Sequence, residues 1–178
     1  MAPDAATGGP ASRLFVAVVP PDDVLDAVAA LPRPAEPGVR WTRPDTWHVT
    51  LRFLGDRVDE ASAIGALAGL RAAPAVAEVG PRVSRLGRNV VCLPVHGLDA
   101  LAAAVADATV GVGDPPDPRP FAGHLTVARL RHRAACGLAG ARFAARFTVR
   151  EVELVRSVLG AGGPTYETIL VQRLVAGA

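Results

Sequence analysis

One short pattern, a histidine followed two positions later by a threonine, occurs twice in apolar segments of this chain. The copies are His48-Val49-Thr50-Leu51 and His124-Leu125-Thr126-Val127, 76 residues apart. Because side chains at positions i and i+2 of a strand point the same way, each histidine shares a strand face with its threonine. Each copy also follows a proline-rich loop. The repeat therefore predicts two similar lobes, each offering one strand edge to a shared cleft.

The hydrophobic pattern around the motifs predicts a mixture of short strands and helices. A six-residue apolar run at 14–19, ended by two prolines, is typical of a buried strand. Helices are expected after Asp22, after a capping Asp59, and over 98–110. Further strands are expected at 47–54, 76–85, 89–95, 121–130, 146–158 and 165–175.

Strict alternation assigns the residues of the first motif strand to two faces. One face would hold Trp47, Val49, Leu51 and Phe53, and the other His48, Thr50, Arg52 and Leu54. In the second motif strand the same rule puts Arg129 on the face opposite His124. Arg129 would reach the histidine face only if the strand twists or bulges.

Composition excludes several kinds of chemistry. All 19 cationic side chains are arginine, so Schiff-base enzymes, Walker-type phosphate loops and ligases that carry a nucleotide on lysine are ruled out. A net charge of +2 is too small for a protein that grips nucleic acid by charge alone. The sequence has no HExxH motif and no CxxC pair, so we expect no metal site.

The ends of the chain and its hydropathy bear on domains and location. Residues 1–12 are small, polar and rich in proline and glycine, which predicts a flexible tail before a single domain over 13–178. No apolar run is long enough for a signal peptide or a membrane span. We therefore expect a cytoplasmic protein.

Two histidine–threonine pairs that face one another could perform acid–base chemistry on a phosphate. Histidine titrates near neutral pH, so a neutral imidazole can take a proton from water while a charged one donates a proton to the leaving oxygen. Each threonine hydroxyl can donate a hydrogen bond to a phosphate oxygen. A cyclic phosphate suits this arrangement.

At this point the chain resembles the two-histidine (2H) phosphoesterase superfamily, and most closely its RNA 2′,3′-cyclic phosphodiesterase (2′-5′ RNA ligase-like) family. The resemblance lies in RLFVAVVPP at 13–21, WTRPDTWHVTLRFLGD at 41–56, FAGHLTVARLR at 121–131 and VELVRSVLGAGGPTYETI at 152–169. It implies a bilobal α+β fold of two pseudo-symmetric antiparallel lobes, with helices outside and a central groove. It also implies hydrolysis of RNA 2′,3′-cyclic phosphate ends to 2′-phosphates, without a cofactor.

The resemblance assigns roles to individual residues. His48 matches the proton donor, and His124 matches the base that activates water. Thr50, Thr126 and Arg129 match groups that bind the phosphate. Phe15 matches a ring that stacks on a nucleobase, although a core phenylalanine explains it equally well.

Two other functions remain open at this level. One is a non-catalytic module that binds RNA ends, and the other is ATP-independent 2′-5′ RNA ligation as the main activity. The expected partners are RNA or nucleotide 2′,3′-cyclic phosphate ends, with no membrane, and the expected state is a monomer.

Overall fold

The structure, a computed structural model, describes residues 11–131, 134–160 and 163–176. Its helices are α1 (Asp22–Ala29), α2 (Glu60–Ala68) and α3 (Asp99–Ala108), with a short 3-10 turn at Pro44–Thr46. The strands are β1 (Ala11–Val18), β2 (Val39–Trp41), β3 (Val49–Asp59), β4 (Ala75–Val79), β5 (Ser84–Leu86), β6 (Val90–His96), β7 (His124–Leu130), β8 (Ala145–Val149), β9 (Glu151–Gly160) and β10 (Gly163–Arg173).

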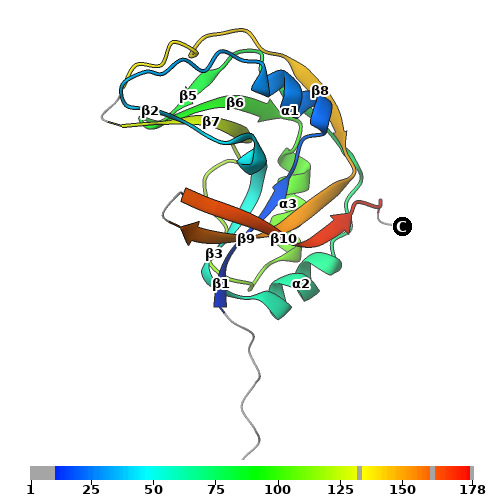
Figure 1. Ribbon diagram of the computed structural model, residues 1–178. Helices are drawn as coiled ribbons and strands as arrows, with labels where there is room; N and C mark the ends of the chain where they lie inside the picture. The colour runs from blue at the N-terminus through cyan, green and yellow to red at the C-terminus, as the bar shows by residue number, and fades with distance from the viewer. Residues whose placement is uncertain (1–10, 132–133, 161–162, 177–178) are drawn as a thin grey trace, which may run out of the picture.

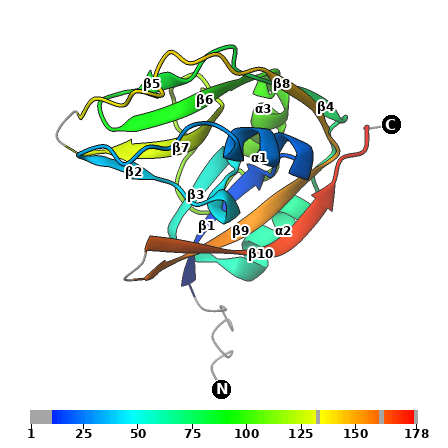
Figure 2. The same ribbon diagram turned by 45° about the horizontal axis from the view of Figure 1, so that its top comes forward.

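The strands of this described part form one antiparallel sheet made of two related halves. The order is β10-β9-β1-β3-β7-β6-β4-β8, with β2 beside β7 and β5 beside β6. The elements β1, α1 and β3 in one half correspond to β6, α3 and β7 in the other, with β2 added between α1 and β3. Figures 1 and 2 show the sheet curled into two lobes, one containing β1, β3, β9 and β10 and the other β5, β6 and β7. The predicted α+β fold of two antiparallel lobes is confirmed.

The helices pack against the sheet and enclose the hydrophobic core. Helix α1 buries Val24 and Val28 and lies against β8, while α2 and α3 pack on β3. Helix α2 begins after Asp59, whose carboxylate accepts a hydrogen bond from the Ser62 backbone N–H, as the sequence predicts. The alternating apolar residues of both motif strands contribute to one continuous core.

Several strand boundaries differ from the prediction. Strand β3 continues past Gly55 to Asp59, because β1 pairs with it along this whole length. The predicted strand 76–85 is divided into β4 and β5, with Gly80-Pro81 between them, and proline lacks the N–H that a continuous ladder needs. The predicted strand 146–158 is divided at Arg150, where the chain passes from β8, beside β4, to β9, beside β1. Strand β2 was not predicted.

The predicted N-terminal tail falls mainly outside the described residues. Residues 1–10 are not described, and β1 begins at Ala11, so the last two residues of the predicted tail belong to this strand. None of the described helices is long and apolar enough to cross a membrane.

Candidate active site

The two motif strands, β3 and β7, meet at the middle residue of each motif. Val49 pairs with Leu125 in an antiparallel register, and both side chains are fully buried. The antiparallel direction of this pair places His48 beside Thr126 and His124 beside Thr50. The two imidazoles therefore lie on one diagonal of a four-residue group, and the two hydroxyls lie on the other.

Both histidines are held by the same local hydrogen bond. The Nδ1 atom of His48 lies 2.8 Å from the Thr46 carbonyl oxygen, and Nδ1 of His124 lies 2.8 Å from the Ala122 carbonyl oxygen. A carbonyl only accepts, so each Nδ1 carries the proton. In the neutral ring, Nε2 is then the free base, and this is the nitrogen left to exchange a proton with a ligand.

Gly123 allows the second of these hydrogen bonds. A Cβ atom at this position would lie 2.5 Å from the Val95 carbonyl oxygen and 3.0 Å from the Phe121 ring. The absence of a side chain lets the backbone pass close to β6, where the Val95 N–H donates to the Gly123 carbonyl at 2.8 Å. This close approach fixes the turn that carries the Ala122 carbonyl next to His124.

A β-bulge follows the threonine in each motif strand and reverses the alternation. In β3 the partners in β1 change from Ala17↔Thr50 to Val16↔Arg52, which leaves one extra residue in β3. In β7 the partners in β6 change in the same way, from Cys92↔Thr126 to Val91↔Ala128. The burial patterns of residues 48–54 and 124–130 are identical as a result.

Because of these bulges, several residues after the threonine lie on the opposite strand face from the one predicted. Arg52 was predicted on the histidine face, but it points to the opposite side and bonds to the end of α3. Leu54, predicted on that same face, is instead fully buried in the core. Phe53 was predicted to face away, but it lines the same groove as His48 and Thr50. Arg129 reaches that groove through the bulge in β7.

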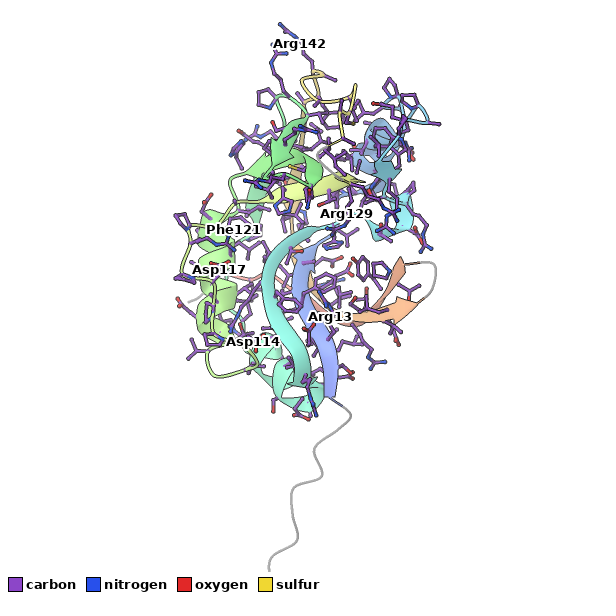
Figure 3. The ribbon with its side chains drawn as sticks, turned by 90° about the vertical axis from the view of Figure 1, so that its left-hand side faces the viewer. Arg13, Asp114, Asp117, Phe121, Arg129 and Arg142 are labelled. Carbon is purple, nitrogen blue, oxygen red and sulfur yellow. The ribbon has the colours of Figure 1, made fainter. Side chains whose placement is uncertain are left out.

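The four motif residues line one groove of about 490 Å³ between the lobes. Phe15, Arg129 and Phe53 also line it, together with Arg13, Arg40, Trp41, Thr42, Arg43, Thr46, Ser157, Leu159, Gly163, Pro164 and Tyr166. Figure 3 shows Arg129 near the junction of the two lobes and Arg13 lower on β1, with Asp114 and Asp117 to one side. Of the described residues that line the groove, four are arginines and none is acidic, so the groove attracts anions.

Two aromatic rings surround the His48 imidazole. The ring centroid of Phe15 is 4.8 Å from that of His48, and the Tyr166 centroid is 5.1 Å away, edge-on. Burial lowers the pKa of His48, and the nearby His124 and Arg129 act in the same direction, against the Thr46 hydrogen bond, which raises it. Phe15 is only 6% exposed, and besides His48 it contacts Tyr166, with a centroid distance of 5.2 Å.

Most of the residues that line the groove received no site assignment from the sequence. Arg40 and Phe53 are among these unassigned residues. Alignment of the two motifs could have indicated Phe53, since it follows His48 by five residues just as Arg129 follows His124 by five. Among the described residues no three His, Cys, Asp or Glu side chains gather as a metal site would require.

Comparison with known proteins finds one family model that matches part of the chain. Residues 16–87, which include the first motif, match the family model "LigT like Phosphoesterase". A search of curated proteins found no match.

Solved structures resemble the chain over almost its whole length. The Thermus thermophilus protein TT0787 has a TM-score of 0.76 and 26% identity, covering 93% of this chain and 100% of its own. The complex of Escherichia coli LigT with 3′-AMP has a TM-score of 0.74 and 26% identity, covering 92% and 98%. The complex of E. coli LigT with phosphate has a TM-score of 0.73 and 25% identity, covering 94% and 99%.

Proposed function

On the premise that this chain is a LigT-like phosphoesterase, we propose that it hydrolyses RNA 2′,3′-cyclic phosphate ends to 2′-phosphomonoesters. The observation that carries the proposal is the matched pair of imidazoles, each with Nδ1 bound to a carbonyl and Nε2 left for the ligand. One ring serves as base and the other as acid. This chemistry requires no cofactor.

In-line displacement at phosphorus needs a base and an acid on opposite sides, and the family resemblance assigns the base to His124 and the acid to His48. His124 accepts a proton from the attacking water through Nε2, and the water oxygen bonds to phosphorus. The P–O3′ bond breaks on the opposite side, and His48 gives its Nε2 proton to O3′. The ring is opened, the 2′-phosphate remains, and the two imidazoles have exchanged protonation states.

Thr50, Thr126 and Arg129 are suited to hold the phosphate while this happens. The threonines share the strand faces of the two histidines, and Arg129 returns to the same face after the bulge. Hydroxyl and guanidinium donors stabilise the negative charge that develops on the non-bridging oxygens. The complexes of E. coli LigT with phosphate and with 3′-AMP support this ligand class.

Protonation of His48 depends on the ligand in this scheme. Burial lowers the His48 pKa, so the ring tends to be neutral in the empty groove. A bound phosphodiester brings a negative charge next to the ring and offsets the positive charge of Arg129. Substrate binding therefore favours the charged imidazole that the acid step needs.

The test is incubation with an RNA oligonucleotide ending in a 2′,3′-cyclic phosphate, in the presence of EDTA. We expect conversion to a 2′-phosphate, identified by phosphorus NMR. A 3′-phosphate product would reverse the assigned acid and base, and binding without turnover would indicate a module that only binds RNA ends. A parallel reaction with an added 5′-hydroxyl RNA measures ligation.

A further inference from the structure

Arg40 and Arg129 lie directly opposite each other where β2 pairs with β7. Side chains of directly opposed residues project to the same face of a sheet, and both arginines line the groove. Like charges at such a position oppose each other and destabilise the strand pair.

The groove arginines differ in whether a carboxylate neutralises them. Arg13 forms an ion pair with Asp56 at 2.8 Å, and Arg43 forms one with Asp45 at 2.7 Å. Within the described part of the chain, Arg40 and Arg129 have no such partner. Two adjacent unneutralised guanidinium groups in a groove without acidic lining residues indicate a ligand with more than one negative charge.

Arg40 also extends toward the other lobe. Its Nη1 atom lies 4.0 Å from the position that a Cβ atom on Gly163 would occupy at the start of β10. Figure 1 shows β2 and the β9–β10 hairpin on the same side of the molecule, in different lobes. The Arg40 side chain therefore extends from β2 toward β10. Arg129, in contrast, lies on β7, five residues after His124.

We infer that Arg40 forms a second phosphate site, which binds a phosphate other than the one undergoing reaction on the same ligand. The inference rests on the proposed function, in which Arg129 takes the terminal cyclic phosphate. The second phosphate is attached to O5′ of the terminal nucleotide, either as a 5′-phosphomonoester or as the phosphodiester to the preceding nucleotide. Arg40 thus makes the enzyme select phosphorylated nucleotides or oligonucleotide ends over simple nucleoside cyclic phosphates.

Binding and turnover together test this site. Calorimetry compares the binding of adenosine 3′-phosphate with that of adenosine 3′,5′-bisphosphate. Neither nucleotide has a cyclic phosphate, so neither is consumed during the measurement. Kinetics compare adenosine 2′,3′-cyclic phosphate, its 5′-phosphorylated form and the dinucleotide ApA 2′,3′-cyclic phosphate. The variants are Arg40→Gln and, as a matched charge control, Arg88→Gln, an exposed residue that does not line the groove.

We expect the wild type to bind the bisphosphate about tenfold more tightly than the monophosphate, as a charge-assisted contact would give. Arg40→Gln should remove most of that preference and leave monophosphate binding unchanged, and Arg88→Gln should preserve the preference. A preference in kcat/KM for the 5′-phosphorylated nucleotide would identify a phosphomonoester as sufficient. A preference for ApA cyclic phosphate alone would identify the phosphodiester of an oligonucleotide.

Equal binding of the two nucleotides by the wild type would overturn the second site, and so would equal weakening of both by Arg40→Gln. Different outcomes of these experiments test the proposed function. If bisphosphate is preferred through Arg40 but no cyclic phosphate is hydrolysed, the second site stands and the hydrolase assignment falls. If all cyclic substrates are hydrolysed with equal kcat/KM and bind without preference, the hydrolase assignment stands and the second site falls.

Discussion

Arg52 is the buried arginine behind the first motif, and its replacement should unfold the protein at a lower temperature. The side chain is 6% exposed and leaves β3 on the face away from the groove. Its guanidinium donates four hydrogen bonds around the end of α3, to the carbonyls of Ala106 (3.1 Å), Val112 (3.3 Å) and Asp114 (2.9 Å) and to the hydroxyl of Thr109.

The loss in free energy of unfolding depends on which of the four acceptors water can reach once the Arg52 guanidinium is removed. Asp114 is exposed, so its carbonyl can be hydrated when the guanidinium is gone. Thr109 is fully buried and Ala106 is partly buried, so their acceptors lose a charged donor with little compensation. Leaving a buried acceptor unsatisfied costs about 1–3 kcal/mol, so the loss of both partners should cost about 2–6 kcal/mol. For a chain of this size that corresponds to a fall in Tm of about 4–24 °C.

The variant is Arg52→Met, which keeps an apolar stem of comparable length. Urea unfolding followed by circular dichroism gives the change in the free energy of unfolding, and calorimetry gives the change in Tm. Arg146→Met is the control, because Arg146 is 71% exposed and its ion pair with Glu78 is long, at 3.7 Å. A loss below about 1 kcal/mol for Arg52→Met, the range of an exposed ion pair, would refute the reasoning.

Three further predictions concern the groove histidines and the ion pair between Glu60 and Arg156. His48→Ala or His124→Ala should each lower kcat/KM by about 10²–10⁴-fold, and the double variant should lose far less than the product of the two, as steady-state kinetics will show. NMR titration should place the His48 pKa below that of an ordinary imidazole, and Phe15→Ala should raise it by admitting water; an unchanged midpoint contradicts this. Arg156 lowers the pKa of Glu60, so this carboxylate stabilises the fold above its unfolded pKa of about 4.3, and the stabilisation is lost as pH falls through the folded pKa. Glu60→Gln should therefore lower Tm more at about pH 7 than at about pH 3, and an equal loss at both refutes the assignment.

The repeated motif was sufficient to predict the two-lobed architecture and which residues meet. His48 and His124 had a clear signal because histidine and threonine recur at the same spacing in two apolar segments. The face of each residue beyond the threonine was not predictable in this way. A bulge depends on the neighbouring strand, and alternation along a single strand contains no information about its partner. Arg52 and Phe53 were exchanged for this reason.

Other parts of the groove gave no readable pattern. Strand β2 has only three residues, and nothing in its sequence distinguishes Arg40 from an ordinary exposed arginine. Its importance comes from lying opposite Arg129, which is a property of strand pairing. Phe15 was assigned two alternative environments, and it combines them, because it is buried and also forms part of the groove lining beneath His48.

The matching burial patterns of the two motif strands have a consequence for the orientation of the substrate. In a site with two equivalent halves, a cyclic phosphate could bind in two poses related by a half-turn, with the leaving oxygen directed at either histidine. Each pose would yield a different regioisomer, and equal poses would yield a mixture. After the bulge, however, β3 presents Phe53 where β7 presents Arg129. An aromatic ring on one side and a cation on the other give the two poses unequal free energies. Each factor of ten in the ratio of the two regioisomers needs about 1.4 kcal/mol of difference in free energy between the poses.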